Sequence, residues 1–508
     1  MINITGKNLG IEEFEKIIFK NEKINISDEV YETVSESFNF LQNFSKNKLI
    51  YGVNTGLGPM AQYKIEENEQ IQLQYNLIRS HAAGIGKTLE KEYARAATLA
   101  RLKSLSLGYS GVHKDLLRIL SDFINNDIHP YIPEHGGVGA SGDLVQLAHL
   151  ALNIIGEGEI FYRNEKYETK YILKKLNIKP FEIRMREGLA LINGTSVMTG
   201  IGLVNLLQAK KIFNIAILTS SLINEIVGSF DDHFSDNLNK TKQHYGQIFV
   251  AQAMQEKLAG SKLIRKRDEV FYREENIKDK VFTQKVQEYY SLRCVPQILG
   301  PVKETIDNAE KILIEEINSV NDNPVIDYRT NNIYHGGNFH GDYISFEMDK
   351  LKIAVTKLTM LIERQLNYLL NSKLNEILPP FVNLGKLGFN LGMQGTQFVA
   401  TSTTAENQTL SNPMYIHSIP NNNDNQDIVS MGTNAALITA KVIDNSFQVA
   451  SVFALTIAQA VDYLKIEDKL SLAGKEFYSQ IREIVPVFEQ DNIKYTELNE
   501  IKDFLQKK

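Results

Sequence analysis

Ala140, Ser141 and Gly142 form a triplet, within a Gly-rich stretch, that has the makings of a self-modifying segment. The side chains carry little bulk, and Gly142 adopts backbone angles that other residues find costly, so its amide nitrogen can approach the Ala140 carbonyl. If that nitrogen attacks and two waters leave, the product is a five-membered ring with an exocyclic methylene derived from Ser141. Such a ring is an electrophile, which no standard side chain supplies. On the triplet alone, a turn in which Ser141 caps the apolar helical run 144–155 is the stronger interpretation.

Four further segments between predicted helices are rich in Gly, Asn and Tyr: 51–59, 187–195, 290–296 and 335–341. Tyr51 lies on the first, a Gly-rich loop, and Asn193-Gly194 ends the second, and each is an ordinary turn when taken alone. Arg293 follows Tyr290 by three residues, and a guanidinium binds a carboxylate bidentately, although a surface ion pair is the default. The fourth segment is either a loop that lets backbone approach a ligand closely or a tight turn.

Composition and charge exclude several classes of protein. The chain has 508 residues, 43% hydrophobic and 23% charged, which is ordinary for a soluble protein of two or three domains. A net charge of -6 and a pI near 6.0 argue against nucleic-acid or anionic-membrane partners. Apolar stretches such as 212–227 are expected to be too short and polar to span a bilayer, and no signal peptide is apparent.

Cysteine and histidine usage indicates a reducing compartment and no metal site. Cys294 is the single cysteine, which excludes an intramolecular disulfide. The ten His form no tight ligand cluster with Cys294 or with carboxylates. We therefore expect a cytoplasmic protein that needs no metal.

Helical periodicity dominates the sequence. Amphipathic helices are predicted in 30–41, 66–81 and 89–107, and a small hairpin in 159–168. Longer helical patterns follow residue 200, in 201–227, 302–320, 346–375 and 433–464. A helix of about 30 residues is roughly 45 Å long, and helices that are apolar on more than one side must be bundled with one another and with a neighbouring subunit. We predict a mainly α fold with an N-terminal domain, 1–200, that carries the triplet, and a helical-bundle domain, 201–508.

The motifs occur together in the order found in a known family. From Tyr51 to about Met431, the chain resembles the aromatic amino-acid ammonia-lyases that carry a methylidene-imidazolone (MIO) group: histidine, phenylalanine and tyrosine ammonia-lyases and the related aminomutases. As a whole it is most similar to bacterial tyrosine ammonia-lyases. The resemblance implies a fold shared with the fumarase and aspartase group, and a homotetramer whose active sites draw residues from more than one subunit. It also implies that MIO forms from Ala140, Ser141 and Gly142, without an external cofactor or a metal.

The same resemblance assigns residues to the chemistry. Ammonia is hard to remove from an aromatic amino acid because the amine is a poor leaving group and the β-proton is not acidic. By similarity, the MIO electrophile captures the amine, and Tyr51 removes the β-proton from a loop that closes over substrate. Tyr290 would assist ring formation or proton movement. Helix N-termini near the ring would stabilise negative charge that develops on it.

Other residues are assigned by the resemblance to substrate binding. Arg293 would hold the substrate carboxylate, with support from Asn323 of the segment 321–324. For Asn323 and Gln287 a purely structural role is the alternative. Asn193 and Gln287 would position the carboxylate or the ring, Phe339 would pack against the MIO group, and Asn425 would bind near the carboxylate or the amine.

Two positions bear on which aromatic ring is bound. His81 occupies the ring-selectivity position of the family, where phenylalanine lyases have an apolar pair, and an imidazole hydrogen-bonds either a phenol or a substrate imidazole. Another group of tyrosine lyases has its His one position earlier, where this chain has Ser80. Gln426 precedes Asp427-Ile428, as in phenylalanine and tyrosine enzymes, whereas histidine lyases have Glu there, which suits a cationic ring. A neutral pocket with one polar group fits tyrosine, so we predict a tyrosine ammonia-lyase that forms trans-p-coumarate and ammonia.

Three alternatives stay open at this point. A histidine ammonia-lyase would form urocanate, and a tyrosine 2,3-aminomutase would share the same motifs but hold its product until ammonia adds back. Outside the enzymes, a catalytically inactive assembly protein would retain the fold alone. The presence of Ser141, Tyr51 and Arg293 argues against that third alternative.

Overall fold

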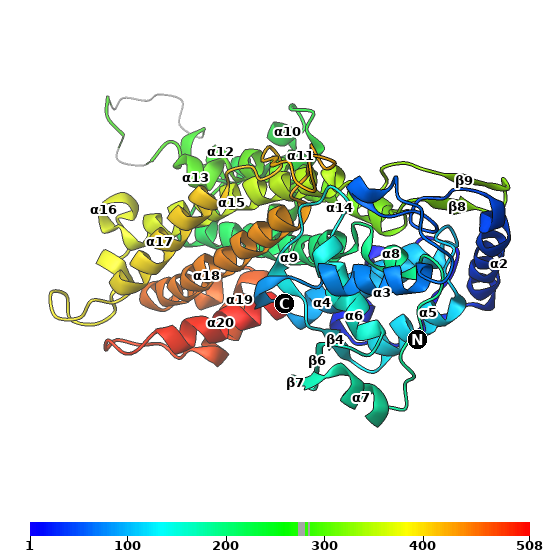
Figure 1. Cartoon of the computed structure of the whole chain (residues 1–508). Coiled ribbons are helices and arrows are strands. Elements are labelled where there is room, and N and C mark those ends of the chain that lie inside the picture. Colours follow the sequence, from blue (N-terminus) through cyan, green and yellow to red (C-terminus); the bar gives the residue numbers. More distant parts are fainter. Residues whose placement is uncertain (273–279, 283–284) are drawn as a thin grey trace. The chain divides into compact units, whose positions relative to one another are not determined.

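Helices make up most of the structure, a computed structural model that describes residues 1–272, 280–282 and 285–508 (Figure 1). This confirms the mainly α prediction. The chain forms two compact units, each assembled from discontinuous segments. The first unit comprises Met1–Leu207, Ala309–Asp349 and Pro413–Ala440, and the second comprises Gln208–Asn308, Lys350–Asn412 and Lys441–Lys508. The sequence analysis expected two consecutive domains that meet near residue 200. Each observed unit is instead built from three segments that are separated in the sequence.

Long helices in the described part of the chain contribute residues to both units: α9 (Ser196–Ile226), α14 (Val295–Ile317), α15 (Asp342–Leu370) and α18 (Gly432–Leu464). They match the long helical patterns predicted after residue 200. By length and composition, α9 and α18 are apolar enough to cross a membrane, contrary to the sequence analysis. However, 78% of the most apolar window of each is buried inside the protein, so burial accounts for that composition.

Amphipathic and fully buried helices build the first unit. α2 (Asp28–Phe44) begins with two acidic residues, which favour a helix N-terminus, and buries one apolar stripe that includes Val30, Val34 and Leu41. α4 (Lys91–Ser106) differs, because nearly every residue from Ala94 onward is buried. The other helices that lie wholly in this unit are α1 (Ile11–Phe19), α3 (Gln70–His81), α5 (Lys114–Asn125), α6 (Leu144–Ile154), α7 (Thr169–Lys175) and α8 (Glu187–Ile192).

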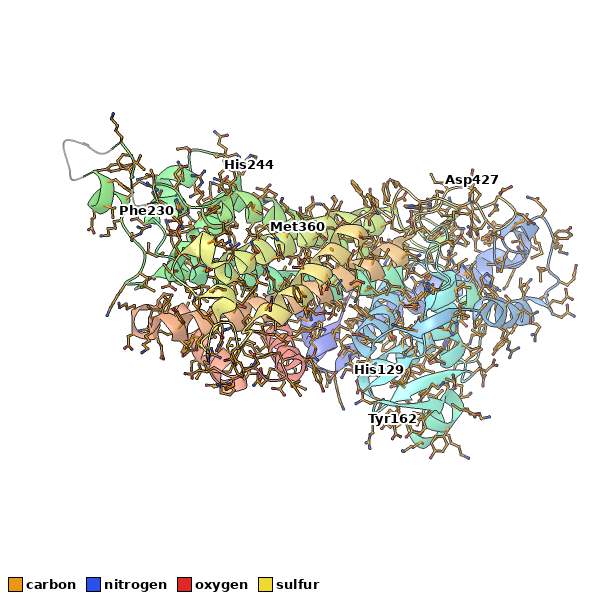
Figure 2. All side chains as sticks on the ribbon, turned by 90° about the vertical axis from the view of Figure 1, so that its left-hand side faces the viewer. His129, Tyr162, Phe230, His244, Met360 and Asp427 are labelled. Carbon is orange, nitrogen blue, oxygen red and sulfur yellow. The ribbon has the colours of Figure 1, made fainter. Side chains whose placement is uncertain are left out.

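Small sheets lie at the periphery of the same unit. β1 (Ile2–Ile4) pairs with β2 (Ile24–Ile26) in parallel, and the antiparallel pairs are β3 (Ile85–Thr88) with β5 (Pro133–His135) and β8 (Val325–Asp327) with β9 (Asn332–Tyr334). β4 (Ile128–Pro130), β6 (Glu159–Tyr162) and β7 (Glu165–Glu168) form an antiparallel sheet in that order. Figure 2 labels His129 and Tyr162 on its neighbouring strands β4 and β6.

The hairpin predicted in 159–168 is confirmed as β6 and β7. Tyr162 pairs with Glu165 across a two-residue turn formed by Arg163 and Asn164. Both turn residues have positive φ, 52° and 65°, as a turn that matches strand twist requires.

Three helices of the first unit position the site. α3, α6 and α8 pack against one another, as Figure 1 shows. His81 is the last residue of α3, the triplet immediately precedes α6, and Asn193 immediately follows α8. Packing of these helices therefore brings together three segments that are far apart in the sequence.

Buried polar contacts join the long helices within the second unit. The Asn407 amide of α17 (Gln394–Leu410) donates to the Val442 carbonyl of α18 at 3.1 Å and to Ser446 Oγ at 3.3 Å. Gln365 of α15 donates to Ser220 Oγ of α9 at 2.9 Å. The helices that lie wholly in this unit are α10 (Asp236–Asn239), α11 (Tyr245–Leu258), α12 (Arg267–Phe271), α13 (Tyr290–Arg293), α16 (Ser372–Asn375), α17, α19 (Leu472–Ile484) and α20 (Tyr495–Lys507).

Candidate active site

A cavity of about 760 Å³ in the first unit collects most of the predicted site residues. Its lining includes Tyr51, His81, Ser141, Asn193, Asn323, Phe339, Asn425 and Gln426. These residues come from the 51–65 loop, the end of α3, the triplet, the turn after α8, and the loops that precede α15 and α18. Figure 2 labels Asp427, the chain neighbour of Gln426, on the last of these loops. Ala140 and Gly142, the buried neighbours of Ser141, complete the triplet at the cavity wall.

Space around the triplet permits only glycine at position 142. Gly142 has φ of +72°, and it pairs with Gly194 as an isolated parallel bridge. A β-carbon at position 142 would overlap the carbonyl oxygen of Gly194, which also accepts a hydrogen bond from the Asp143 amide at 2.8 Å. Both the positive φ and the close approach of backbone therefore require glycine. The tight backbone pairing that the structure shows here fits a segment that is converted into a ring.

A chain of amides surrounds Ser141. The Asn193 Nδ2 donates to the Ser141 carbonyl at 3.0 Å, and the Gln426 Nε2 donates to Ser141 Oγ at 2.9 Å. Asn193 Oδ1 accepts from the Asn323 amide at 2.9 Å, and Asn323 Oδ1 accepts from the Gly336 amide at 2.8 Å. Because the Asn193 side chain is held at both ends, its donor to the Ser141 carbonyl is fixed before any ligand binds.

Asp143 lies behind the triplet and joins the starts of three helices. It is the N-cap residue of α6, a position that the turn interpretation had given to Ser141. Its carboxylate accepts from the Val197 and Met198 amides of α9, at 2.8 and 2.9 Å, and from the Thr433 hydroxyl of α18. Complete burial raises the pKa of Asp143 to about 6 against the lowering effect of these donors. The triplet therefore lies at the N-terminus of α6, and the next residue, Asp143, contacts the N-terminus of α9.

Tyr51 lies just before a loop that an antiparallel bridge between Thr55 and Lys64 closes. Its hydroxyl oxygen accepts a hydrogen bond from the Gly58 amide at 3.0 Å. Gly58 has φ of +55° and begins a 3₁₀ turn, Gly58–Met60, which also lines the cavity. The phenol is therefore held at the wall of the cavity by a backbone donor from that loop.

His81 lines the cavity, and its Nδ1 has two described hydrogen-bond contacts. Its Nδ1 lies 3.0 Å from the Leu77 carbonyl oxygen and 3.0 Å from Ser80 Oγ. Since a carbonyl only accepts, the proton of the neutral ring is on Nδ1, and Nε2 is an acceptor. Nε2 has no hydrogen-bond partner among the described residues. Leu73 and Leu77, at helical spacing from His81 on α3, give the adjoining wall an apolar surface.

The cavity carries almost no charge. None of the described residues that line it is Asp, Glu, Lys or Arg, and its polar groups are mainly carboxamides: Asn76, Asn193, Asn323, Asn422, Asn425 and Gln426. Carboxamides donate hydrogen bonds without supplying a counter-charge. A bound amino acid would therefore find amide donors here, but no cation for its carboxylate.

Gln287, Tyr290 and Arg293 are not in this lining. They belong to the second unit, where they line another cavity of about 740 Å³ together with Lys285, Arg364 and Tyr368. Tyr290 begins the short helix α13 and is 70% exposed, and the Arg293 guanidinium lies over its ring at 4.8 Å from the ring centre. The predicted carboxylate ligand and the second tyrosine thus belong to a different unit from the residues around Ser141 and are absent from the described lining of its cavity.

Several residues around the triplet were not predicted from the sequence. Asp143 ends the motif that contains the triplet, so its position beside Ser141 was a usable signal. Gly194 was noted only as part of a turn. Arg101 donates to the Asn193 carbonyl at 2.6 Å from the middle of α4, where no local pattern distinguishes it.

Comparisons with known proteins agree with this geometry. The family model described as aromatic amino acid lyase matches residues 9–483. A tyrosine 2,3-aminomutase of Chondromyces crocatus is 38% identical over 97% of this chain and 93% of its own length. A histidine ammonia-lyase of Staphylococcus saprophyticus is 35% identical over 99% of both. The crystal structure of a tyrosine aminomutase from Streptomyces globisporus, 35% identical, superposes with a TM-score of 0.95 over 100% of this chain and 97% of the other. The chain belongs to the family of MIO-dependent aromatic amino-acid ammonia-lyases and aminomutases, and it is a carbon–nitrogen lyase.

Proposed function

We propose that the chain is a tyrosine ammonia-lyase, which converts L-tyrosine to trans-p-coumarate and ammonia. The observation that carries the proposal is the His81 imidazole, whose Nδ1 is bound to the Leu77 carbonyl so that Nε2 accepts a phenol hydroxyl at the end of an apolar wall. Gln426 adds support, because a neutral amide offers no charge complementarity to a cationic imidazole substrate.

Ala140, Ser141 and Gly142 would form the MIO group, and the residues present fit it. Gly142 occupies a place where no β-carbon fits, and Asn193 and Gln426 already donate to the two oxygens of Ser141. Once formed, the group supplies an electrophile that makes the substrate amine a better leaving group. The two amides then serve to orient what is bound beside them, as does Phe339 by packing.

Tyr51 would act as the general base that removes the β-proton. Its hydroxyl lines the same cavity as Ser141, and the Gly58 amide donates to its oxygen, which favours negative charge on that atom. Closure of the 51–65 loop would bring the phenol against the substrate and exclude water.

The missing cation points to a second copy of the chain. The carboxylate of a bound amino acid needs a positive partner, and the described lining of the cavity offers none. We propose that Arg293 of a second copy supplies it, with Tyr290 and Gln287, and that Asn323 and Asn425 assist from within the cavity. This agrees with the homotetramer with shared active sites that the family resemblance implies. We also propose that the assembly acts in the cytoplasm.

A tyrosine 2,3-aminomutase is the second candidate, because relatives at 38% and 36% identity bear that name. It would use the same residues and return ammonia to the β-carbon before release. Histidine ammonia-lyases are represented at 35% identity, but Gln426 and the uncharged cavity disfavour a cationic ring.

The test is an incubation of purified protein with L-tyrosine, L-histidine and L-phenylalanine side by side, with every product identified chromatographically. The proposal expects coumarate in large excess over urocanate and cinnamate. Substantial β-tyrosine would establish the aminomutase instead. Urocanate as the main product would refute the tyrosine assignment and the argument from Gln426.

A further inference from the structure

Arg101 is a wholly buried cation that lies immediately behind the site. Its Nη1 donates to the carbonyl oxygens of Asn193, at 2.6 Å, and Ala190, at 3.3 Å, and its Nη2 donates to Asn321 Oδ1. Each partner is a neutral oxygen, and no described ion pair includes Arg101. Burial lowers its pKa to about 10, so the guanidinium is charged at neutral pH. The charges of Asp322 and Asp143 attract the guanidinium, but all of its described hydrogen bonds go to neutral oxygens. A fully buried cation without a direct ion pair is costly, which calls for a specific function.

The guanidinium and Asn321 confine the Asn193–Gly194 peptide from one side. Gly194 has φ of +144°, and a β-carbon there would lie 2.8 Å from both Nη atoms and 2.6 Å from Asn321 Oδ1. Asn321 is itself fixed, because Ser104 Oγ donates to its Oδ1 at 3.0 Å and its Nδ2 donates to Thr195 Oγ1 at 3.0 Å. The Asn193–Gly194 peptide therefore cannot move toward Arg101.

The opposite side of the same peptide contacts the triplet. Gly194 O accepts from the Asp143 amide at 2.8 Å and blocks the space beside Gly142. The Asn193 side chain donates to the Ser141 carbonyl at 3.0 Å. Arg101 touches no atom of the triplet in the described contacts. It contacts Asn193, and Asn193 and Gly194 in turn contact Ser141 and Gly142.

We propose that Arg101 is a positioning residue for the self-modification of the triplet. In that reaction the Gly142 nitrogen bonds to the Ala140 carbonyl carbon, and the Ala140 oxygen leaves as water with the amide protons of Gly142 and Ser141. Ser141 Oγ leaves as a second water with its own proton and the Cα proton. The bond forms only while Gly142 is held against Ala140, and Arg101 maintains that backbone geometry through Asn193 and Gly194. The inference rests on the proposed function, since it concerns the formation of the electrophile.

The test compares Arg101→Met with the matched control Arg95→Met. Arg95 lies on the same helix, is 3% exposed, and likewise donates to backbone carbonyls, those of Ile17 and Ile124, both at 2.9 Å. Its described contacts include no residue of the triplet or of the turn that confines it. Intact mass at timed points after cell-free synthesis measures the loss of two waters, near-ultraviolet absorbance measures the chromophore, and thermal unfolding measures stability.

We expect both variants to lose stability, and only Arg101→Met to lose water more slowly, by about a hundredfold. Arg101→Lys keeps the charge but not the forked geometry, so it should mature at an intermediate rate, and it serves as the test if Arg101→Met does not fold. Loss of both waters at the parent's rate by either Arg101 variant would overturn the proposal. Retention of both waters by the parent protein would overturn the proposed function itself, and with it this inference.

Discussion

Replacing His81 by Phe should transfer the substrate preference from tyrosine to phenylalanine. In the parent, the Leu77 carbonyl holds Nδ1 at 3.0 Å, and Nε2 is the acceptor for the substrate hydroxyl. In the variant that hydroxyl meets an apolar ring and the Leu73 and Leu77 side chains. An unpaired buried hydroxyl costs about 1–3 kcal/mol, which corresponds to a loss of about 5- to 150-fold in kcat/KM for tyrosine. Phenylalanine leaves no hydroxyl unpaired, so its kcat/KM should hold or rise.

The assay is the ratio of kcat/KM for tyrosine to that for phenylalanine, measured by coumarate and cinnamate absorbance on the same preparation. Ser80→Ala is the matched control, because it removes the hydroxyl near Nδ1 but leaves the Leu77 contact and Nε2 in place. The control should change the ratio little. If His81→Phe left the ratio unchanged while the chromophore was complete, His81 would not contact the ring, and the argument for tyrosine would fail.

Further predictions concern the triplet, the base and the buried carboxylate. Ser141→Ala should abolish the near-ultraviolet chromophore and nearly all turnover, and a parent-like rate would exclude MIO chemistry. Tyr51→Phe should keep the chromophore and lower kcat by about 10²- to 10⁴-fold; loss of the chromophore instead would assign Tyr51 to maturation. The pKa of Asp143, about 6, lies above the ordinary Asp value, so its protonated form favours folding. Relative to Asp143→Asn, the parent's free energy of unfolding should fall by about 2 kcal/mol between pH 4 and pH 6. An equal pH dependence of the two proteins' unfolding free energies, measured with denaturant across that range, would contradict the assignment.

Local periodicity predicted the four long helices and several helices of the first unit, but not how the helices are grouped. The buried stripe of Val30, Val34 and Leu41 on α2 is a local pattern, and the structure places that helix where the pattern predicts it. The two compact units depend instead on contacts between segments that are far apart in the sequence, and the spacing of residues within one segment does not predict such contacts. The N-cap of α6 illustrates the same limit. Ser141 and Asp143 are both good capping residues, and the choice of Asp143 depends on α9 and α18, whose amides and hydroxyl hold its carboxylate.

The sequence predicted the residues that line the cavity more completely than the buried residues that hold the lining in place. Tyr51 was noted on its Gly-rich loop, and His81 and Gln426 were assigned through the family resemblance; the structure places all three in the lining of the cavity that contains Ser141. Arg101 could not be singled out, because its contacts lie 92 residues away at Asn193 and 220 residues away at Asn321. An arginine in a helix is ordinarily exposed, and only the fold shows that this one is buried.

Neutral side chains line the cavity at the triplet, whereas the predicted carboxylate ligand, Arg293, is a cation in the other unit. The described contacts that confine the triplet, from Asn193 and Gln426 to Ser141, lie within the first compact unit. Recognition of a carboxylate is different, because amide donors alone do not replace a counter-charge. Arg293 is half-buried, lies over the Tyr290 ring and takes part in no described ion pair, so its charge is available to a ligand. On the proposed function, the groups that surround the electrophile therefore come from the first unit, whereas the cation that binds the substrate carboxylate comes from the second unit of another copy.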